Sequence, residues 1–92
     1  MLTYILTGAN RGLGLEFVRQ LSTSPTNTIL ACVRDLQSTD ANTDLLALSQ
    51  GAKGKVHVLE CDVSNEESVG KVRGEVEKIL GGGKIDFLLN NA

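Results

Sequence analysis

The sequence predicts an α/β fold in which four parallel strands alternate with three helices. Four short apolar runs recur along the 92 residues, and within them the apolar residues do not alternate with polar ones, which is typical of strands buried on both faces of a parallel sheet. Helical patterns separate the runs. Polar residues or glycine end each run, and these ends follow one another at spacings of 26, 28 and 28 residues, which indicates repeated strand–helix–strand units.

The predicted strands cover residues 2–6, 28–33, 55–60 and 85–89. Their side chains are of the kinds that pack well on a pleated surface, because β-branched and aromatic residues favour strands. The residues of this kind are Tyr4, Ile29, Val33, Val56, Val58, Ile85 and Phe87.

The first predicted helix follows the first strand. Three apolar residues at four-residue spacing form its expected core face: Leu13, Phe17 and Leu21. Val18 lies beside this stripe. Pro25 comes just after the helix, which proline cannot continue because it lacks a backbone N–H.

The second and third helices are predicted from similar stripes. In the second helix, which Gly51 closes, the stripe is formed by Ala41, Leu45 and Leu48. In the third and longest helix the stripe is formed by Val69, Val72, Val76, Ile79 and Leu80. Ser64 and Glu67 predict a capping box at its start, and glycines 81–83 end it.

Right-handed crossovers and doubly wound connections give the strand order 3-2-1-4. In this order the first two helices cover one face of the sheet, the third helix covers the other, and the fourth strand is an uncovered edge. Ligands of such sheets bind outside the carboxyl ends of the strands, where the winding reverses. The candidate functional residues are therefore the ones that follow the four strands.

Composition excludes several classes of function. A net charge of −2 argues against a nucleic-acid-binding surface, and no run approaches the roughly 18 apolar residues of a membrane span. Cys32 and Cys61 are too few and too far apart for a disulfide framework or a metal site, so they are expected to be small buried apolar residues. The sequence therefore predicts a cytoplasmic protein without metal, nucleic-acid or membrane partners.

The first strand is followed by a glycine-rich segment, residues 7–14, called the glycine loop below. Its glycines, Gly8, Gly12 and Gly14, lead directly into a helix, where a phosphate can approach the backbone and the positive end of the helix. A plain strand-to-helix turn would not need three glycines. The pattern T-G-x-x-x-G-x-G resembles that of the short-chain dehydrogenase/reductase family, above all its carbonyl-reductase-like and C-factor-like members.

Arg34 and Asp35 follow the second strand, beside the expected adenosine ribose of a bound dinucleotide. A carboxylate at this position would favour NAD by accepting from the 2′-hydroxyl. Arginine, together with Arg11 of the glycine loop, would instead hold the 2′-phosphate of NADP. Because the arginine comes first, the sequence predicts NADP rather than NAD; a solvated charge pair is the alternative.

The remaining site residues come from the resemblance. It implies that Asp62 accepts from the adenine amino group and that the backbone of Val63 contacts the ring; Asp62 is alternatively a residue that helps Ser64 start the third helix. Residues 90–92 resemble the family's Asn-Asn-Ala-Gly motif, which lies along the cofactor ribose. Two adjacent asparagines after a strand are otherwise simply turn formers.

The resemblance covers residues 2–92 and implies a Rossmann-type fold that binds NADP. The expected cofactor-binding residues are Gly8, Asn10, Arg11, Gly12, Leu13, Gly14, Arg34, Asp35, Asp62, Val63, Asn90 and Ala92.

In the family, a serine and a Tyr-x-x-x-Lys motif reduce a carbonyl, or oxidise an alcohol, together with the nicotinamide. This chain has neither, and Tyr4 is not followed by lysine four residues later. We therefore expect an incomplete sheet and no catalytic residues: residues 1–92 would be the N-terminal part of one NADP-binding domain, cut before its catalytic half. The parent would act on a small carbonyl or alcohol substrate, with homo-oligomers possible.

Two alternatives stay open. One is a non-catalytic, truncated module that binds a nucleotide or a protein partner. The other is an extended sugar-nucleotide enzyme, although its usual G-x-x-G-x-x-G spacing does not fit Gly8, Gly12 and Gly14.

Overall fold

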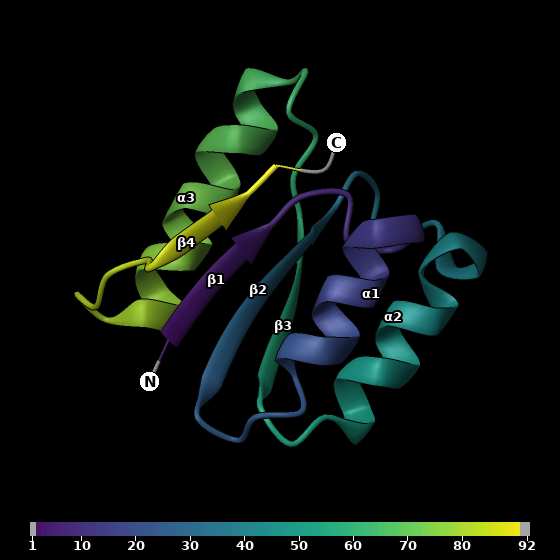
Figure 1. Ribbon diagram of the computed structural model, residues 1–92. Coiled ribbons are helices and arrows are strands. Elements are labelled where there is room, and N and C mark those ends of the chain that lie inside the picture. Colours follow the sequence, from purple (N-terminus) through teal and green to yellow (C-terminus); the bar gives the residue numbers. More distant parts are fainter. Residues whose placement is uncertain (1, 91–92) are drawn as a thin grey trace.

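Four parallel strands form one sheet in the order β3-β2-β1-β4, as the sequence predicts (Figure 1). The computed structural model describes residues 2–90. Its elements in chain order are β1 (Leu2–Leu6), α1 (Gly12–Leu21), β2 (Asn27–Val33), α2 (Thr39–Gly51), β3 (Lys55–Glu60), α3 (Glu66–Leu80) and β4 (Phe87–Leu89). The fold is of Rossmann type. No helix among the described residues is long and apolar enough to cross a bilayer.

The core lies on both sides of β2. Alternate residues of a strand point to opposite faces, and Ile29, Ala31 and Val33 pack in the layer formed with α1 and α2. Leu30 and Cys32 face the other way and pack beneath α3. Figure 1 shows α1 and α2 together on one face of the sheet and α3 on the other. This is the predicted arrangement of the three helices.

Helix α1 turns a different face to the sheet from the one predicted. Gly14 and Val18 are its buried residues, whereas Leu13 and Phe17 are 69% and 41% exposed. The helix carries apolar residues on more than one side, so periodicity alone does not select the face. Packing on the sheet selects the side with Val18, and Leu21 joins that side partly buried.

Helix α2 also differs from its predicted stripe. Leu45 is buried and Leu48 is partly buried in the core, as expected. Ala41 is exposed, and its neighbour Asn42 is fully buried instead. The amide of Asn42 makes hydrogen bonds at both ends, which offset the cost of burying it.

The predicted capping box of α3 is wrong. Asn65 is the N-cap, and its Oδ1 accepts from the backbone N–H groups of Glu67 at 2.9 Å and Ser68 at 3.2 Å. Ser64 lies one residue outside, where its hydroxyl donates to Asp62 Oδ1 at 2.6 Å. The nearby carboxylate of Asp62 engages the serine, so the asparagine caps the helix. At the other end Gly81, with φ of 56°, ends α3 as predicted.

Strand β4 is two residues shorter than predicted and starts at Phe87. Before it, the carboxylate of Asp86 accepts from Thr3 N at 2.8 Å, and Asp86 N donates to Thr3 O at 2.9 Å. Tyr4 stacks on Phe87 across the β1–β4 pair, with ring centroids 5.1 Å apart. At this end of the β1–β4 pair, one backbone bond is thus kept and the Asp86 carboxylate supplies the other acceptor.

The described residues expose several large apolar side chains: Leu13, Phe17, Phe87 and Leu88. A purified chain of residues 1–92 is expected to bind an apolar-surface dye and to self-associate, because exposed apolar faces and open edge strands promote association. Leu88→Lys places a charge on the edge strand and should lower the associated fraction in sedimentation velocity. A monomer that binds no dye would contradict this expectation.

A second prediction concerns the start of α3. Asn65→Ala removes the acceptor of two backbone N–H groups and is expected to lower the free energy of unfolding by about 1 kcal/mol. Ser64→Ala, its matched control, removes only an exposed bond to Asp62 and should cost less than about 0.5 kcal/mol. Urea unfolding of the intact protein measures both values. If Ser64→Ala lowers the free energy of unfolding more than Asn65→Ala does, Ser64 rather than Asn65 is the N-cap of α3.

Candidate dinucleotide-binding site

The glycine loop runs from the end of β1 into the first turn of α1. Gly8 and Gly12 have φ angles of 61° and 53°, in the left-handed region that favours glycine. The loop is attached to both neighbouring strands: Thr7 N donates to Leu89 O at 3.0 Å, and Ala9 N donates to Cys32 O at 3.2 Å. Strand pairing and two glycine conformations thus set its path.

The amino end of α1 is suited to an anion. Its N-cap is Arg11, whose exposed side chain makes no capping hydrogen bond, and the described first turn contains no acidic residue. The positive end of the helix dipole is therefore neither capped by a side chain nor neutralised by a carboxylate. A phosphate group fits this position.

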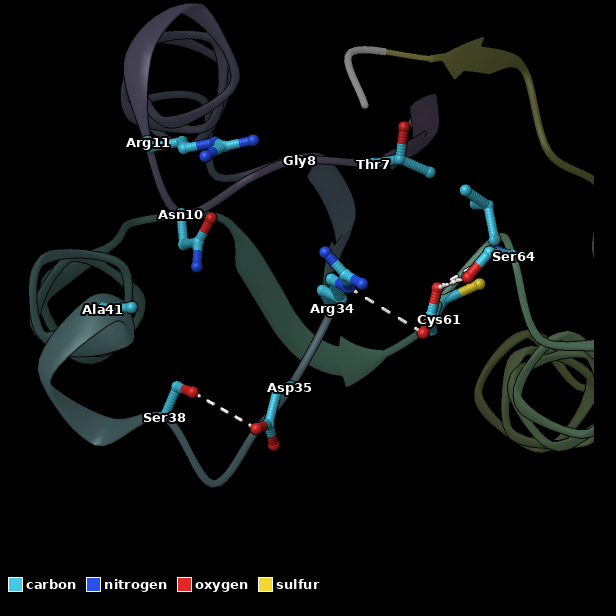
Figure 2. Close-up of a pocket in the computed structure, with 12 residues that line it drawn as sticks. Thr7, Gly8, Asn10, Arg11, Arg34, Asp35, Ser38, Ala41, Cys61 and Ser64 are labelled. Carbon is cyan, nitrogen blue, oxygen red and sulfur yellow. Dashed lines mark hydrogen bonds and ion pairs between the residues drawn. The ribbon is translucent and has the colours of Figure 1, made fainter.

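A cavity of about 640 Å³ lies at the carboxyl ends of β1, β2 and β3 (Figure 2). Its walls are the glycine loop, the loop of residues 34–38 between β2 and α2 (the β2–α2 loop), the start of α2 and the segment after β3. The lining residues are Thr7, Gly8, Asn10, Arg11, Arg34, Asp35, Ser38, Ala41, Cys61, Asp62, Val63 and Ser64.

Seven of the expected site residues line this cavity: Gly8, Asn10, Arg11, Arg34, Asp35, Asp62 and Val63. Four others lie elsewhere. Gly12 and Leu13 are exposed on the first turn of α1, Gly14 is buried in α1, and Asn90 Oδ1 accepts from Thr7 Oγ1 at 2.9 Å. Ala92 lies outside the described residues.

Sequence reasoning missed five of the lining residues. Thr7, Cys61 and Ser64 are chain neighbours of predicted positions, so a wider window around each strand end would have included them. Ser38 and Ala41 lie at the start of α2, which forms part of the cavity wall. No local sequence signal marks these two.

The two acidic residues of the cavity are engaged by their own loops. Asp35 accepts from Gln37 N at 2.9 Å and from Ser38 Oγ at 3.2 Å, and Asp62 accepts from Ser64 N at 3.0 Å. Hydrogen bonds from the Ser64 hydroxyl and N–H, with a smaller contribution from Arg34, lower the pKa of the Asp62 carboxyl. Asp62 thus contacts Ser64, but not in the expected role, because Asn65 rather than Ser64 caps α3.

Arg34 leaves the end of β2 with 84% of its side chain exposed, and its Nε lies 3.8 Å from Asp62 Oδ2. Figure 2 shows Arg34 and Arg11 entering the cavity from two different loops. At this distance and exposure the contact with Asp62 is weak, so the guanidinium can turn to an anionic ligand.

The cavity contains one thiol, and its surroundings disfavour the thiolate form. Cys61 lines the cavity and packs against the α3-side core, and burial raises its pKa. Cys32, behind it, is buried, and desolvation raises its pKa to about 12. Cys32 is thus a small buried apolar residue, as the sequence predicts, whereas Cys61 is only partly buried at the cavity wall.

The strand order, the glycine conformations and the cavity define a Rossmann-type fold with a site suited to a dinucleotide. A sequence profile described as short chain dehydrogenase matches residues 3–92. The chain belongs to the short chain dehydrogenase family.

Relatives and solved structures agree with this family. The short chain dehydrogenase virK of Hypocrea virens is 39% identical over 92 residues, which are 100% of this chain and 32% of the relative. The farnesol dehydrogenase of Aedes aegypti is 35% identical over 89 residues, which are 96% of this chain and 34% of the relative. The chain therefore spans about a third of the length of the curated relatives it matches.

The NADPH-bound carbonyl reductase from chicken fatty liver superposes with a TM-score of 0.88 at 27% identity, over 98% of this chain and 34% of that one. An alcohol dehydrogenase from Thermococcus sibiricus in complex with 5-hydroxy-NADP has a TM-score of 0.73 at 27% identity, over 96% of this chain and 35% of that one. Over the matched residues these structures share the fold of this chain.

Proposed function

We propose that the chain is the N-terminal, NADP-binding part of a short-chain oxidoreductase that acts on a small carbonyl or alcohol substrate. The observation that carries this proposal is the pair of guanidinium groups, Arg11 and Arg34, at a cavity whose carboxylates are already engaged. The Asp35 carboxylate bonds within its own loop, so the group offered beside β2 is a cation. A cation there suits a 2′-phosphate, whereas an available carboxylate would suit a 2′-hydroxyl.

The residues present fit a dinucleotide. The glycine loop and the positive end of α1 would receive the pyrophosphate, and Arg11 with Arg34 would hold the 2′-phosphate. Asp62 and Val63 would lie along the adenine, and Asn90 with Ala92 along the ribose. NADP supplies the hydride chemistry when bound. Similarity to the NADPH-bound carbonyl reductase supports this assignment.

The catalytic residues are proposed to lie outside residues 1–92. No serine and Tyr-x-x-x-Lys pair of the family type follows the fourth strand in this sequence. A purified chain of residues 1–92 is therefore expected to show no NADPH oxidation with aldehydes, ketones or quinones, measured as absorbance of the reduced nicotinamide. Turnover above the rate without protein would overturn this part of the proposal.

The cofactor preference is tested by Arg34→Ala in the intact protein. The dissociation constant for NADPH is expected to rise about tenfold or more, because charge-assisted bonds to a phosphate are lost, while that for NADH stays within about twofold. Nicotinamide fluorescence measures both constants. Arg73→Ala removes an exposed arginine from α3, away from the cavity, and should change neither.

The same titrations decide between NADP and NAD. Equal affinity of the unmodified protein for NADPH and NADH, or an unchanged NADPH constant in Arg34→Ala, would contradict the assignment of Arg34. Location in the cytoplasm and assembly into homo-oligomers stay predictions from the sequence.

A further inference from the structure

Asn42 is a fully buried polar side chain in the first turn of α2. It occupies a core position where a helix that covers a sheet ordinarily carries an apolar residue. An amide in such a place is costly unless its groups are hydrogen-bonded. The hydrogen-bond partners of the Asn42 amide therefore indicate the role of this residue.

Both ends of the Asn42 amide bind to loops of the cavity. Oδ1 accepts from Asn10 Nδ2 at 2.8 Å, and Nδ2 donates to the backbone carbonyl of Asp35 at 2.8 Å. Asn10 belongs to the glycine loop and Asp35 to the β2–α2 loop. One buried side chain thus bridges two loops that are otherwise attached to different strands.

The two bridged residues are the chain neighbours of the two cations. Asn10 precedes Arg11, and Asp35 follows Arg34. In Figure 2 the Asn10 side chain leaves the glycine loop on the side of the helix that carries Ala41, and Arg34 and Asp35 follow the end of a strand. The bridge therefore joins the two backbone segments from which the two arginines extend.

We propose that Asn42 is a positioning residue that sets the preference for NADP over NAD by holding the glycine loop and the β2–α2 loop at a fixed distance from each other. The inference rests on the proposed function, since it needs a 2′-phosphate between Arg11 and Arg34. Charge-assisted hydrogen bonds depend on geometry, so one phosphate is gripped by both cations only when their loops are correctly spaced.

The effect falls on the 2′-phosphate more than on the rest of the cofactor. The glycine loop keeps its path through the bond from Ala9 N to Cys32 O and through the glycine conformations, neither of which involves Asn42. The outer part of the β2–α2 loop is held by the bond from Leu36 N to Glu60 Oε1 at 3.0 Å. Loss of the bridge therefore shifts the loops relative to each other without unravelling either.

The test uses Asn42→Leu, which keeps the number and branching of the side-chain heavy atoms and removes both bonds. In the intact protein the ratio of the NADH to the NADPH dissociation constant is expected to fall about fivefold to tenfold, the worth of about one hydrogen bond. The NADH constant itself should stay within about twofold. Asn10→Ala removes one arm of the bridge from a half-exposed position and should give a smaller fall in the same ratio.

A double variant tests the connection. The bond between Asn10 and Asn42 is already lost in Asn42→Leu. Adding Asn10→Ala to Asn42→Leu should therefore cause no further fall in the ratio of the NADH to the NADPH dissociation constant. The matched control is Asn27→Ala, which removes a side-chain bond of 2.9 Å to Leu21 O at the other end of the sheet. It should lower the melting temperature and leave the ratio unchanged.

Each result supports or overturns the inference. If Asn42→Leu raises both dissociation constants equally, or changes only the melting temperature as the control does, Asn42 is merely structural. If Asn42→Leu does not fold, an unchanged ratio in Asn10→Ala overturns the inference. If Arg34→Ala abolishes the preference for NADPH over NADH and the Asn42 and Asn10 variants leave it unchanged, the role of Asn42 is refuted and the proposed function stands. An unmodified protein without any preference would refute the proposed function and this inference together.

Discussion

The burial of β2 between two helical layers is the constraint on which the rest of the structure depends. Every residue from Thr28 to Val33 is buried, with alternate side chains under α1 and α2 or under α3. A strand buried on both faces has to pair on both edges, and β1 and β3 do so in parallel. Parallel pairing brings the ends of all three strands to one side, which is where the cavity forms.

The loops at that side are shaped by polar side chains that bind backbone groups. Asp35 and Glu60 bind N–H groups of the β2–α2 loop, Asp62 binds its own turn, and Asn42 joins two loops. These bonds engage the acidic residues at the cavity. They leave the arginines as the charged groups that can meet a ligand, so loop architecture and ligand charge are linked.

Two predictions from the sequence were wrong by one position: the residue that caps α3 and the residue of α2 that is buried next to Leu45. Ser64 and Asn65 are both good capping residues. Asn65 caps α3 because the hydroxyl of Ser64 is hydrogen-bonded to the Asp62 carboxylate. Helix α2 buries Asn42 rather than Ala41 because the two loops supply partners for its amide. Periodicity and propensity describe a residue's own preference, and these outcomes depend on partners far away along the chain.

The sequence by itself determined the order of strands and helices, the parallel sheet, the glycine loop and the three strand ends at which the cavity lies. These follow from local patterns, since apolar runs, helical stripes and glycines act over a few residues. Only the tertiary structure decided which face of α1 is buried, that Ser38 and Ala41 line the cavity, and that the Asp35 carboxylate is engaged while Arg34 is exposed. Those outcomes depend on contacts between loops, whose geometry is set when the helices pack on the sheet.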